Sequence, residues 1–379
     1  MTYRSGRFVS VSRSSVGINI ENLFSVVRNI SAGSNNKVST MESHKNMSNG
    51  SSLSITTVPE PEVRALVKHS VRTQVRSYLI ALRPWSFSAS INPVILGTAL
   101  ALKSSTESGL SPSNLVVFLA ALVAALSVHG AGNLVNTYYD YLKGIDSKKS
   151  DDRTLVDGIL TPDNVATFGQ ALYIVGCLAI VVLYYISPAR LEHIALLYFG
   201  GLSSSFLYTG GIGLKYLALG DLVIMFTFGP LTVMFAYTSQ SGSLELFPLL
   251  YAVPLAMNTE AILHSNNARD MESDRKAGIV TIAMCLGKTG SYILYALLMF
   301  VPYILFAIMG VNFSLRYLLP FLTLPMAFNL EKDFRRGEMD KLPQRTAKLN
   351  LVFGVLYILA CLLVPSRAMP GVTNPLISK

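Results

Sequence analysis

Two polar segments, each following an apolar run, combine carboxylates, amides and cations at regular spacing. In HSNNARDMESDRKAG (264–278), Asn266, Asp270 and Asp274 are spaced i, i+4 and i+8. On a helix of 3.6 residues per turn, such positions drift by only about 40° and rise by about 6 Å per step. They would form one stripe of oxygen ligands roughly 12 Å long. Carboxylate and amide oxygens are donors that suit Mg²⁺.

An earlier segment, GNLVNTYYDYLKGIDSKKSDDRT (132–154), carries a second stripe. Asn136 and Asp140 are again four residues apart, and Asp146 follows Gly144, which can turn the chain. Two such stripes that face each other across a bundle would hold metal ions between them. The expected metal ligands are Asn136, Asp140, Asn266, Asp270 and Asp274, and the expected catalytic acids are Asp140, Asp146, Asp152, Asp270 and Asp274.

Cationic side chains are interleaved with these acids, with Lys149 in the first segment and Arg269 in the second. Acids alone would suggest a cation channel, whereas acids mixed with Arg and Lys indicate a polyanionic ligand, above all a diphosphate. A third segment, FLYTGGIGLKYLALGD (206–221), adds a phenol and an ammonium around a Gly-rich turn. The residues expected to bind substrate are Lys148, Arg153, Tyr208, Lys215, Asn267 and Arg275.

Several other chemistry-bearing residues favour ordinary structural roles. Glu272 points roughly 160° away from Asp274 on a helical wheel and is expected to face solvent or an ion pair. His129, His193 and His264 stand alone in apolar surroundings and are expected to be packed neutral side chains. The three cysteines are scattered singly, so disulfide, zinc and thiol chemistry have no support in the sequence.

The composition places these segments in a membrane protein. Of 379 residues, 51% are hydrophobic and 14% are charged, whereas soluble domains carry about 25% charged residues. The net charge of +9 is explained by basic loops on the side of the membrane that is not translocated. Nothing in the sequence resembles a nucleic-acid-binding module. The expected fold class is an all-α multi-pass membrane protein.

From residue 78 onward, apolar runs alternate with short polar breaks. Some runs are short or contain proline, which is marginal for a hydrocarbon core of roughly 30 Å, so the expected number of spans is about nine. The nine runs are 78–102, 115–137, 165–186, 191–208, 217–237, 246–265, 289–309, 313–329 and 349–364.

Nine crossings would bring the ends of the second, fourth, sixth and eighth runs to one face of the membrane. The loops there contain fifteen Lys and Arg residues, and the opposite loops contain only Lys103, Arg190 and Arg316. Because positive charge gathers on the untranslocated side, this face is expected toward the cytosol or the mitochondrial matrix. Both oxygen stripes emerge on it, as a shared site requires.

Residues 1–74 are polar and rich in Ser and Asn, and they are predicted to form a disordered tail. The start, MTYRSGRFVSVSRSSVGINI, has three arginines, five serines and no acid, which resembles a mitochondrial targeting peptide. A basic cytosolic tail is the alternative. The predicted transmembrane domain covers 75–365, and 366–379 would be a short C-terminal tail.

These motifs resemble the UbiA superfamily of intramembrane aromatic prenyltransferases, whose members have nine transmembrane helices and two Asp-rich motifs, after helices two and six. The resemblance covers about 75–365 and is carried by GNLVNTYYDYLKGIDSKKSDDRTLVDGIL, LSSSFLYTGGIGLKYLALGD, AILHSNNARDMESDRKAGIVT and KLPQRTAKLNL. Many members read Asn-Asp-x-x-Asp-x-x-x-Asp in the first motif. Here Thr137 replaces the first acid and Asp146 lies further along, so Asp146 is a weaker candidate ligand than Asp140.

The resemblance is strongest to members that make menaquinone-4 (vitamin K2) in animals. It implies Mg²⁺-dependent transfer of a geranylgeranyl group from its diphosphate to a reduced naphthoquinone, menadiol. Tyr138, Tyr139 and Tyr208 are candidates to steady an allylic cation, and Asp152 is a candidate proton acceptor. Another aromatic acceptor, as in ubiquinone synthesis, is an alternative. A transporter of cations or diphosphates is a weaker one, because it would carry charges inside the spans, where only Glu260 lies.

The same resemblance implies an association with a reductase of the sterol pathway, in addition to the surrounding lipid. It leaves the organelle open between a mitochondrial membrane and the endoplasmic reticulum or Golgi. In each case the site would face the matrix or the cytosol.

Overall fold

The computed structural model describes residues 75–105, 111–145 and 155–372. Within these ranges the regular structure is helical, and the exception is an isolated parallel bridge between Leu217 and Val280. The predicted N-terminal tail lies outside the described residues, as does the second half, 373–379, of the expected C-terminal tail. The domain boundaries therefore stay predictions, whereas the all-α fold class is confirmed.

Each of the nine predicted runs coincides with a helical segment in the described ranges. The segments are η1 (Pro84–Phe87) with α3 (Ser88–Ser104), α4 (Pro112–Leu142), α5 (Pro162–Ile186), α6 (Leu191–Thr209), α7 (Gly220–Phe226) with η3 (Thr227–Leu231) and α8 (Thr232–Ser241), α9 (Phe247–Lys276), α10 (Ile282–Asn312), η4 (Leu315–Thr323) with α11 (Leu324–Arg336), and α12 (Leu342–Leu363). Short 3₁₀ turns, η2 (Leu214–Tyr216) and η5 (Ser366–Ala368), follow α6 and α12.

Six helical stretches among the described residues are long and apolar enough to cross a membrane, and α6, α9 and α11 lie outside that set. They are Pro84–Ser104, Pro112–Leu142, Pro162–Ile186, Gly220–Ser241, Ile282–Asn312 and Leu342–Leu363. Large apolar side chains on their outer surfaces are exposed, including Tyr185 and Val311, which suits a lipid environment and not water. The multi-pass membrane architecture is confirmed, and the count of nine crossings stays a prediction.

Local sequence explains where the long helices begin. The hydroxyl of Ser111 accepts a hydrogen bond from the backbone N–H of Asn114, and Thr161 caps α5 in the same way through Asn164. Each cap is followed by proline, which is favoured at the first helical position because its missing N–H has no partner there. α10 begins at a third cap, Thr281.

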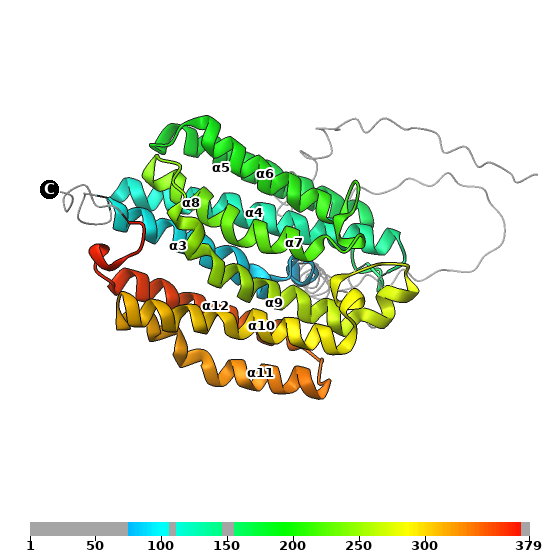
Figure 1. The fold of residues 1–379 in the computed structure, drawn as a ribbon. Helices are drawn as coiled ribbons and strands as arrows, with labels where there is room; N and C mark the ends of the chain where they lie inside the picture. Colours follow the sequence, from blue (N-terminus) through cyan, green and yellow to red (C-terminus); the bar gives the residue numbers. More distant parts are fainter. Residues whose placement is uncertain (1–74, 106–110, 146–154, 373–379) are drawn as a thin grey trace, which may run out of the picture. The chain divides into compact units, whose positions relative to one another are not determined.

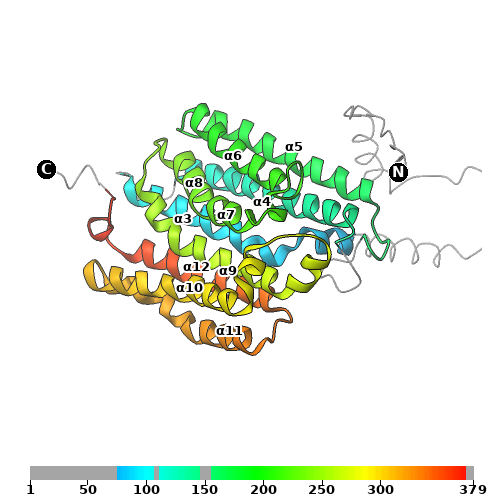
Figure 2. The ribbon, with the colours of Figure 1, turned by 45° about the vertical axis from the view of Figure 1, so that its right-hand side comes forward.

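The helices form a layered bundle. Figures 1 and 2 show α5 and α6 on one side, α10 and α11 on the other, and α3, α4, α8, α9 and α12 between them. α4 packs against α5, α3 against α8, and α9 against α10. The α3–α8 contact is close because Gly97 has no side chain, and a Cβ there would clash with the Val233 carbonyl oxygen. Small residues permit such close approach in membrane helix pairs.

Buried hydrogen bonds tie the middle helices together. The side chain of Asn92 in α3 donates to the carbonyl oxygen of Asn350 in α12 at 2.8 Å. The side chain of Asn350 in turn donates to the hydroxyl of Thr259 in α9 at 3.2 Å. Because an unpaired polar group is costly in an apolar interior, these bonds fix how α3, α9 and α12 meet beside the cavity described next.

Candidate active site

Both polar segments that carry the predicted stripes are helical beyond the apolar runs. α4 continues to Leu142 and α9 continues to Lys276. The four-residue spacings therefore place the side chains of each stripe on one face of one helix, as predicted. Asn136 and Asp140 are buried, with 6% and 4% of their surface exposed.

The first stripe holds the ammonium group of Lys215. Lys215 Nζ donates to Asp140 Oδ2 at 2.7 Å and to Asn136 Oδ1 at 3.0 Å. The Tyr216 hydroxyl donates to Asp140 Oδ1 at 2.9 Å, and the Thr209 hydroxyl donates to Asn136 Oδ1 at 3.2 Å. The two oxygen donors thus converge on one cation, which pairs with a carboxylate that is almost fully buried.

Lys215 and Tyr216 reach this position because the turn after α6 is anchored to the segment after α9. Gly213 has a φ of 62°, in the left-handed region that glycine adopts without steric cost. The Ala218 N–H donates to the Val280 carbonyl oxygen at 2.8 Å. The Lys143 ammonium lies 3.5 Å from the centre of the Tyr216 ring, a cation–π contact. The ends of α4, α6 and α9 are therefore joined at one place.

The second stripe holds a guanidinium group. Arg269 forms two hydrogen bonds of 2.8 Å to the Asp270 carboxylate and one of 2.9 Å to Asn266 Oδ1. Burial raises the pKa of the Asp274 carboxyl to about 6, against the opposing charge of Lys215 and with a further contribution from Asp270. The negative charge of Asp140 also raises the pKa of Asp274. The end of α9 therefore lies near the end of α4.

The donor set fits a hard divalent cation. Each Asn-x₃-Asp pair presents an amide oxygen and a carboxylate to a single positive group, Lys215 in one case and Arg269 in the other. Among the described residues, no three His, Cys, Asp or Glu side chains are grouped closely enough to hold a metal by themselves. One carboxylate and one amide oxygen from each pair suit Mg²⁺, which takes one or two carboxylates and completes its shell with substrate phosphate and water.

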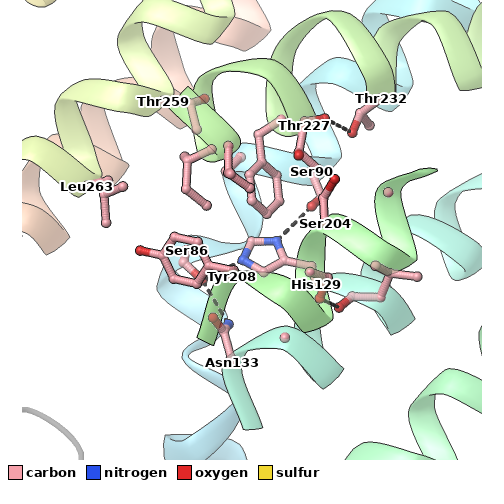
Figure 3. Close-up of a pocket in the computed structure, with 18 of the residues that line it drawn as sticks. Ser86, Ser90, His129, Asn133, Ser204, Tyr208, Thr227, Thr232, Thr259 and Leu263 are labelled. Carbon is pink, nitrogen blue, oxygen red and sulfur yellow. Dashed lines mark hydrogen bonds between the residues drawn. The ribbon is translucent and has the colours of Figure 1, made fainter. Parts of the chain in front are cut away.

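A cavity of about 200 Å³ begins at this polar end and continues between the helices. Asn136, Lys215, Asn266 and Asn267 line it together, so both stripes reach one cavity. Its remaining wall is largely apolar and aromatic and includes Tyr208. Figure 3 shows this interior, with Tyr208 near His129, Ser86 and Asn133.

Comparison with known proteins decides the family. Residues 91–364 match the sequence profile of the UbiA prenyltransferase family. The chain belongs to this family. It is 61% identical over 310 residues to UbiA prenyltransferase domain-containing protein 1 of Mus musculus, covering 82% of this chain and 91% of the mouse protein. A Drosophila melanogaster homologue is 56% identical over 289 residues, covering 76% and 80% of the two chains.

Solved structures of UbiA homologues share the fold. An apo structure from Aeropyrum pernix K1 superposes with a TM-score of 0.54 at 17% identity, covering 72% of this chain and 96% of that one. A homologue from Archaeoglobus fulgidus, bound to GPP and Mg²⁺, gives a TM-score of 0.50 at 14% identity, covering 76% and 100%. Together with the apolar helices, the family and fold establish an intramembrane prenyltransferase.

Not every predicted site residue lies at the cavity of this UbiA-family protein. Asp146, Lys148, Asp152 and Arg153 lie outside the described residues, so their roles stay predictions. Among the described residues, Asp140, Asp270 and Asp274 are not part of the cavity wall, although Asp140 bonds the wall residue Lys215. Arg275 is exposed on α9 and is also absent from the wall. The neighbouring Glu272 is also exposed, in line with the expectation that it faces solvent.

Several site residues of this UbiA-family chain were not singled out from the sequence. Thr209 and Tyr216 bind the first stripe, and both stand in the Gly-rich segment 206–221. Asp221 ends that segment and accepts a hydrogen bond of 3.3 Å from Asn267. His264, expected to be isolated, lies 3.6 Å from Asp221. Polar residues next to the predicted motif were the available signal for Thr209, Tyr216 and Asp221.

Proposed function

We propose that this UbiA-family prenyltransferase transfers a geranylgeranyl group from its diphosphate to menadiol, which forms menaquinone-4. One observation carries the proposal: Asn136 of the first stripe, Asn266 of the second stripe and Lys215 line the polar end of one cavity, whose remaining wall is largely apolar and aromatic. A charged diphosphate head fits the polar end, and a prenyl chain with an aromatic ring fits the apolar remainder. The identity of donor and acceptor rests on the sequence resemblance described above.

The proposed metal ligands are Asn136, Asp140, Asn266, Asp270 and Asp274. Bound Mg²⁺ would offset the negative charge that develops on the leaving diphosphate. The A. fulgidus homologue is bound to GPP and Mg²⁺, which supports Mg²⁺ acting with a prenyl diphosphate. Lys215 and Arg269 now hold the same oxygens. With metal on these oxygens, the two cations would instead bind diphosphate oxygens, which Arg and Lys side chains bind through charge-assisted hydrogen bonds.

Residues around the cavity shield the reacting carbon. The aromatic residues of the wall include Tyr208, Phe228 and Phe235. Aromatic faces stabilise a nearby cation, and an apolar enclosure excludes water that would otherwise capture an allylic cation. Such an arrangement favours transfer of the prenyl group over hydrolysis of the diphosphate.

A transfer assay tests the proposal. Purified protein in lipid nanodiscs would be incubated with labelled geranylgeranyl diphosphate, Mg²⁺ and a set of acceptors that includes menadiol, 4-hydroxybenzoate and homogentisate. The expected product is prenylated naphthoquinol, formed only when a divalent cation is present. Metal-dependent release of diphosphate without a transfer product, or transfer only to another acceptor, would overturn the assignment.

The cellular setting of the enzyme belongs to the proposal as well. We propose that the basic face, which carries the polar end of the cavity, lies toward the cytosol or the matrix, and that a sterol-pathway reductase is a partner. Fusing the first 30 residues to a reporter and measuring mitochondrial import tests the targeting prediction. Import of the reporter favours the mitochondrial placement, and a reporter that stays outside favours the endoplasmic reticulum or Golgi.

A further inference from the structure

The inner part of the cavity contains a neutral hydrogen-bonded group, here called the serine–histidine cluster: Ser86, Ser90, His129 and Asn133 (Figure 3). His129 Nδ1 lies 2.7 Å from the Ser90 hydroxyl, and Nε2 lies 3.1 Å from the Ser86 hydroxyl. All four residues line the cavity. A histidine that serves only as packing would be enclosed by the protein, whereas this network faces a space that a ligand can enter.

The hydrogen bonds indicate which nitrogen of His129 carries the proton. The Ser86 hydroxyl donates to the Arg83 carbonyl oxygen at 2.8 Å and accepts from the Asn133 side chain at 3.3 Å. A hydroxyl has one proton to donate, and Ser86 gives its proton to Arg83. When this bond, the Asn133 bond and both serine–His129 bonds are made, Ser86 therefore accepts a hydrogen bond from His129 Nε2–H. Nδ1 is then unprotonated and accepts the hydroxyl proton of Ser90. The opposite tautomer would give up the Ser86–Arg83 bond.

In this tautomer the Ser90 hydroxyl can act toward a ligand only as a hydrogen-bond acceptor. Its proton is directed at His129, while its remaining lone pairs are free to accept a hydrogen bond. Ser90 is 2% exposed and lines the cavity. A ligand group that donates a hydrogen bond therefore matches Ser90, and a group that only accepts leaves two acceptors facing each other. Leaving buried polar groups unmatched is costly.

Aromatic rings surround the cluster and define the shape of its ligand. The Phe228 ring centre lies 4.6 Å from that of His129, and the Phe87 ring centre lies at 5.1 Å. Phe228 belongs to the π-helix η3, and short π-helical segments are frequent at functional sites. Trp85 also lines the cavity. The aromatic rings of Phe228 and Trp85 in the cavity wall, beside the Ser90 hydroxyl, suit a planar ring that carries a hydroxyl group.

The cluster lies at a suitable depth for an acceptor ring. His129, Asn133, Asn136 and Asp140 occupy one face of α4, at spacings of four, three and four residues. His129 is thus two helical turns, or roughly 10 Å, from Asn136 at the charged end. The space between them has to hold the transferred carbon and the ring that attacks it.

We infer that Ser90, with its proton held by His129, accepts a hydrogen bond from a hydroxyl group of the aromatic acceptor and thereby selects the reduced hydroquinol over the oxidised quinone. A quinone presents only carbonyl acceptors in place of these hydroxyls. The selection suits the chemistry, because the reduced ring is the electron-rich form that attacks an allylic carbon. This inference rests on the proposed function in that it takes a hydroquinol to be the acceptor.

Trp85 offers a direct test, because it is the only tryptophan in the chain and lines the same cavity. Quenching of its fluorescence in the purified full-length protein would report binding of menadiol under anaerobic conditions, of menadione, and of 1,4-dimethoxy-2-methylnaphthalene, which lacks the hydroxyl protons. The wild-type protein is expected to bind menadiol on the order of tenfold more tightly than the dimethyl ether. The variant Ser90→Ala is expected to bring this ratio close to one.

Ser204→Ala is the matched control. Ser204 lines the same cavity, but its hydroxyl donates to the carbonyl oxygen of Gly200 in its own helix at 2.8 Å, so its removal should leave the ratio unchanged. A second variant, His129→Phe, frees the Ser90 proton to donate. It is expected to strengthen menadione binding relative to menadiol, which a purely structural role of His129 would not do.

Equal wild-type affinity for menadiol and its dimethyl ether, or an unchanged ratio in Ser90→Ala, overturns the inference. The transfer assay separates this failure from failure of the proposed function. Transfer to menadiol without discrimination by Ser90 leaves the proposed function in place and removes the inference. Discrimination without transfer removes the proposed function and leaves the cluster as a hydroquinol-binding site.

Discussion

The two ends of the cavity differ in their polar groups, which form ion pairs at one end and a neutral hydrogen-bonded cluster at the other. At the polar end, Asp140 and Asp270 are paired with Lys215 and Arg269. At the inner end, the serine–histidine cluster uses hydroxyls, an amide and an imidazole whose two nitrogens are both hydrogen-bonded to serines. Charged side chains are costly within a bilayer and less so near its surface. The contrast teaches that a charged substrate group and a neutral ring are suited to opposite ends of one cavity.

This contrast predicts different consequences for substitutions at the two ends. Changes at the polar end should weaken metal-dependent binding of the diphosphate and slow transfer with every acceptor. Changes at the inner end should alter discrimination between acceptors and leave diphosphate binding intact.

The largest effect is expected for Asp140→Asn. The substitution keeps the size of the side chain but removes a buried negative charge that holds Lys215 and is assigned to the metal. Transfer should fall by about 10²–10³-fold, the range found when a group that stabilises transition-state charge is removed. The rate of geranylgeranyl transfer at saturating menadiol measures it. Glu272→Gln, on the exposed side of α9, is the control and should retain the wild-type rate.

A smaller effect is expected for Lys215→Met, and it should have opposite signs in two assays. Removing the ammonium costs a charge-assisted hydrogen bond to the diphosphate, so transfer should fall by about 10- to 100-fold. Removing the same ammonium also frees the oxygens of Asn136 and Asp140, so Mg²⁺ binding without substrate should become tighter. Calorimetric titration with Mg²⁺ measures the second effect. Weaker Mg²⁺ binding in this variant would show that Lys215 does not compete with the metal.

A still smaller effect is expected for Gly213→Ala, in the turn that carries Lys215. A Cβ at this position, where φ is 62°, would collide with the Tyr216 ring. The left-handed backbone alone costs a non-glycine residue about 1 kcal/mol. Transfer should fall by about tenfold as Lys215 and Tyr216 shift. The melting temperature, compared with that of Gly158→Ala, distinguishes the collision from backbone strain, because Gly158 has the same φ sign and open space around it.

The smallest effect at the polar end is expected for Arg275→Ala. Its exposed position limits any contribution to that of a solvent-screened ion contact, less than about 1 kcal/mol. The KM for geranylgeranyl diphosphate should rise by no more than about fivefold. A rise of a hundredfold would support the sequence-based prediction that Arg275 binds substrate, and would mean that α9 moves when the diphosphate binds.

The sequence was sufficient to predict side-chain positions that depend on spacing within one helix. The four-residue steps from Asn136 to Asp140 and from Asn266 to Asp270 survive because both helices extend past the apolar runs. The sequence was insufficient to predict contacts between side chains from distant segments. Ser86 and Ser90 precede His129 by 43 and 39 residues, so His129 looked isolated in the sequence.

The positions of the helices were predictable for a similar reason. Apolar runs mark buried or lipid-facing segments wherever they lie, and all nine coincide with helical segments in the described ranges. Hydropathy could not foresee the internal breaks, such as the π-helix at Thr227–Leu231 and the non-helical Gly287 in α10. These breaks depend on which neighbouring helices accept the released backbone groups.

A double-substitution cycle in diphosphate binding tests the shared polar end most directly. The affinity for geranylgeranyl diphosphate with Mg²⁺ would be measured in the wild type, in Asp140→Asn, in Asp270→Asn and in the double variant. If both carboxylates hold one metal–diphosphate group, the double variant should lose little more affinity than either single variant, with an interaction energy above about 1 kcal/mol. Losses that add within about 0.5 kcal/mol would mean that the two stripes belong to independent sites.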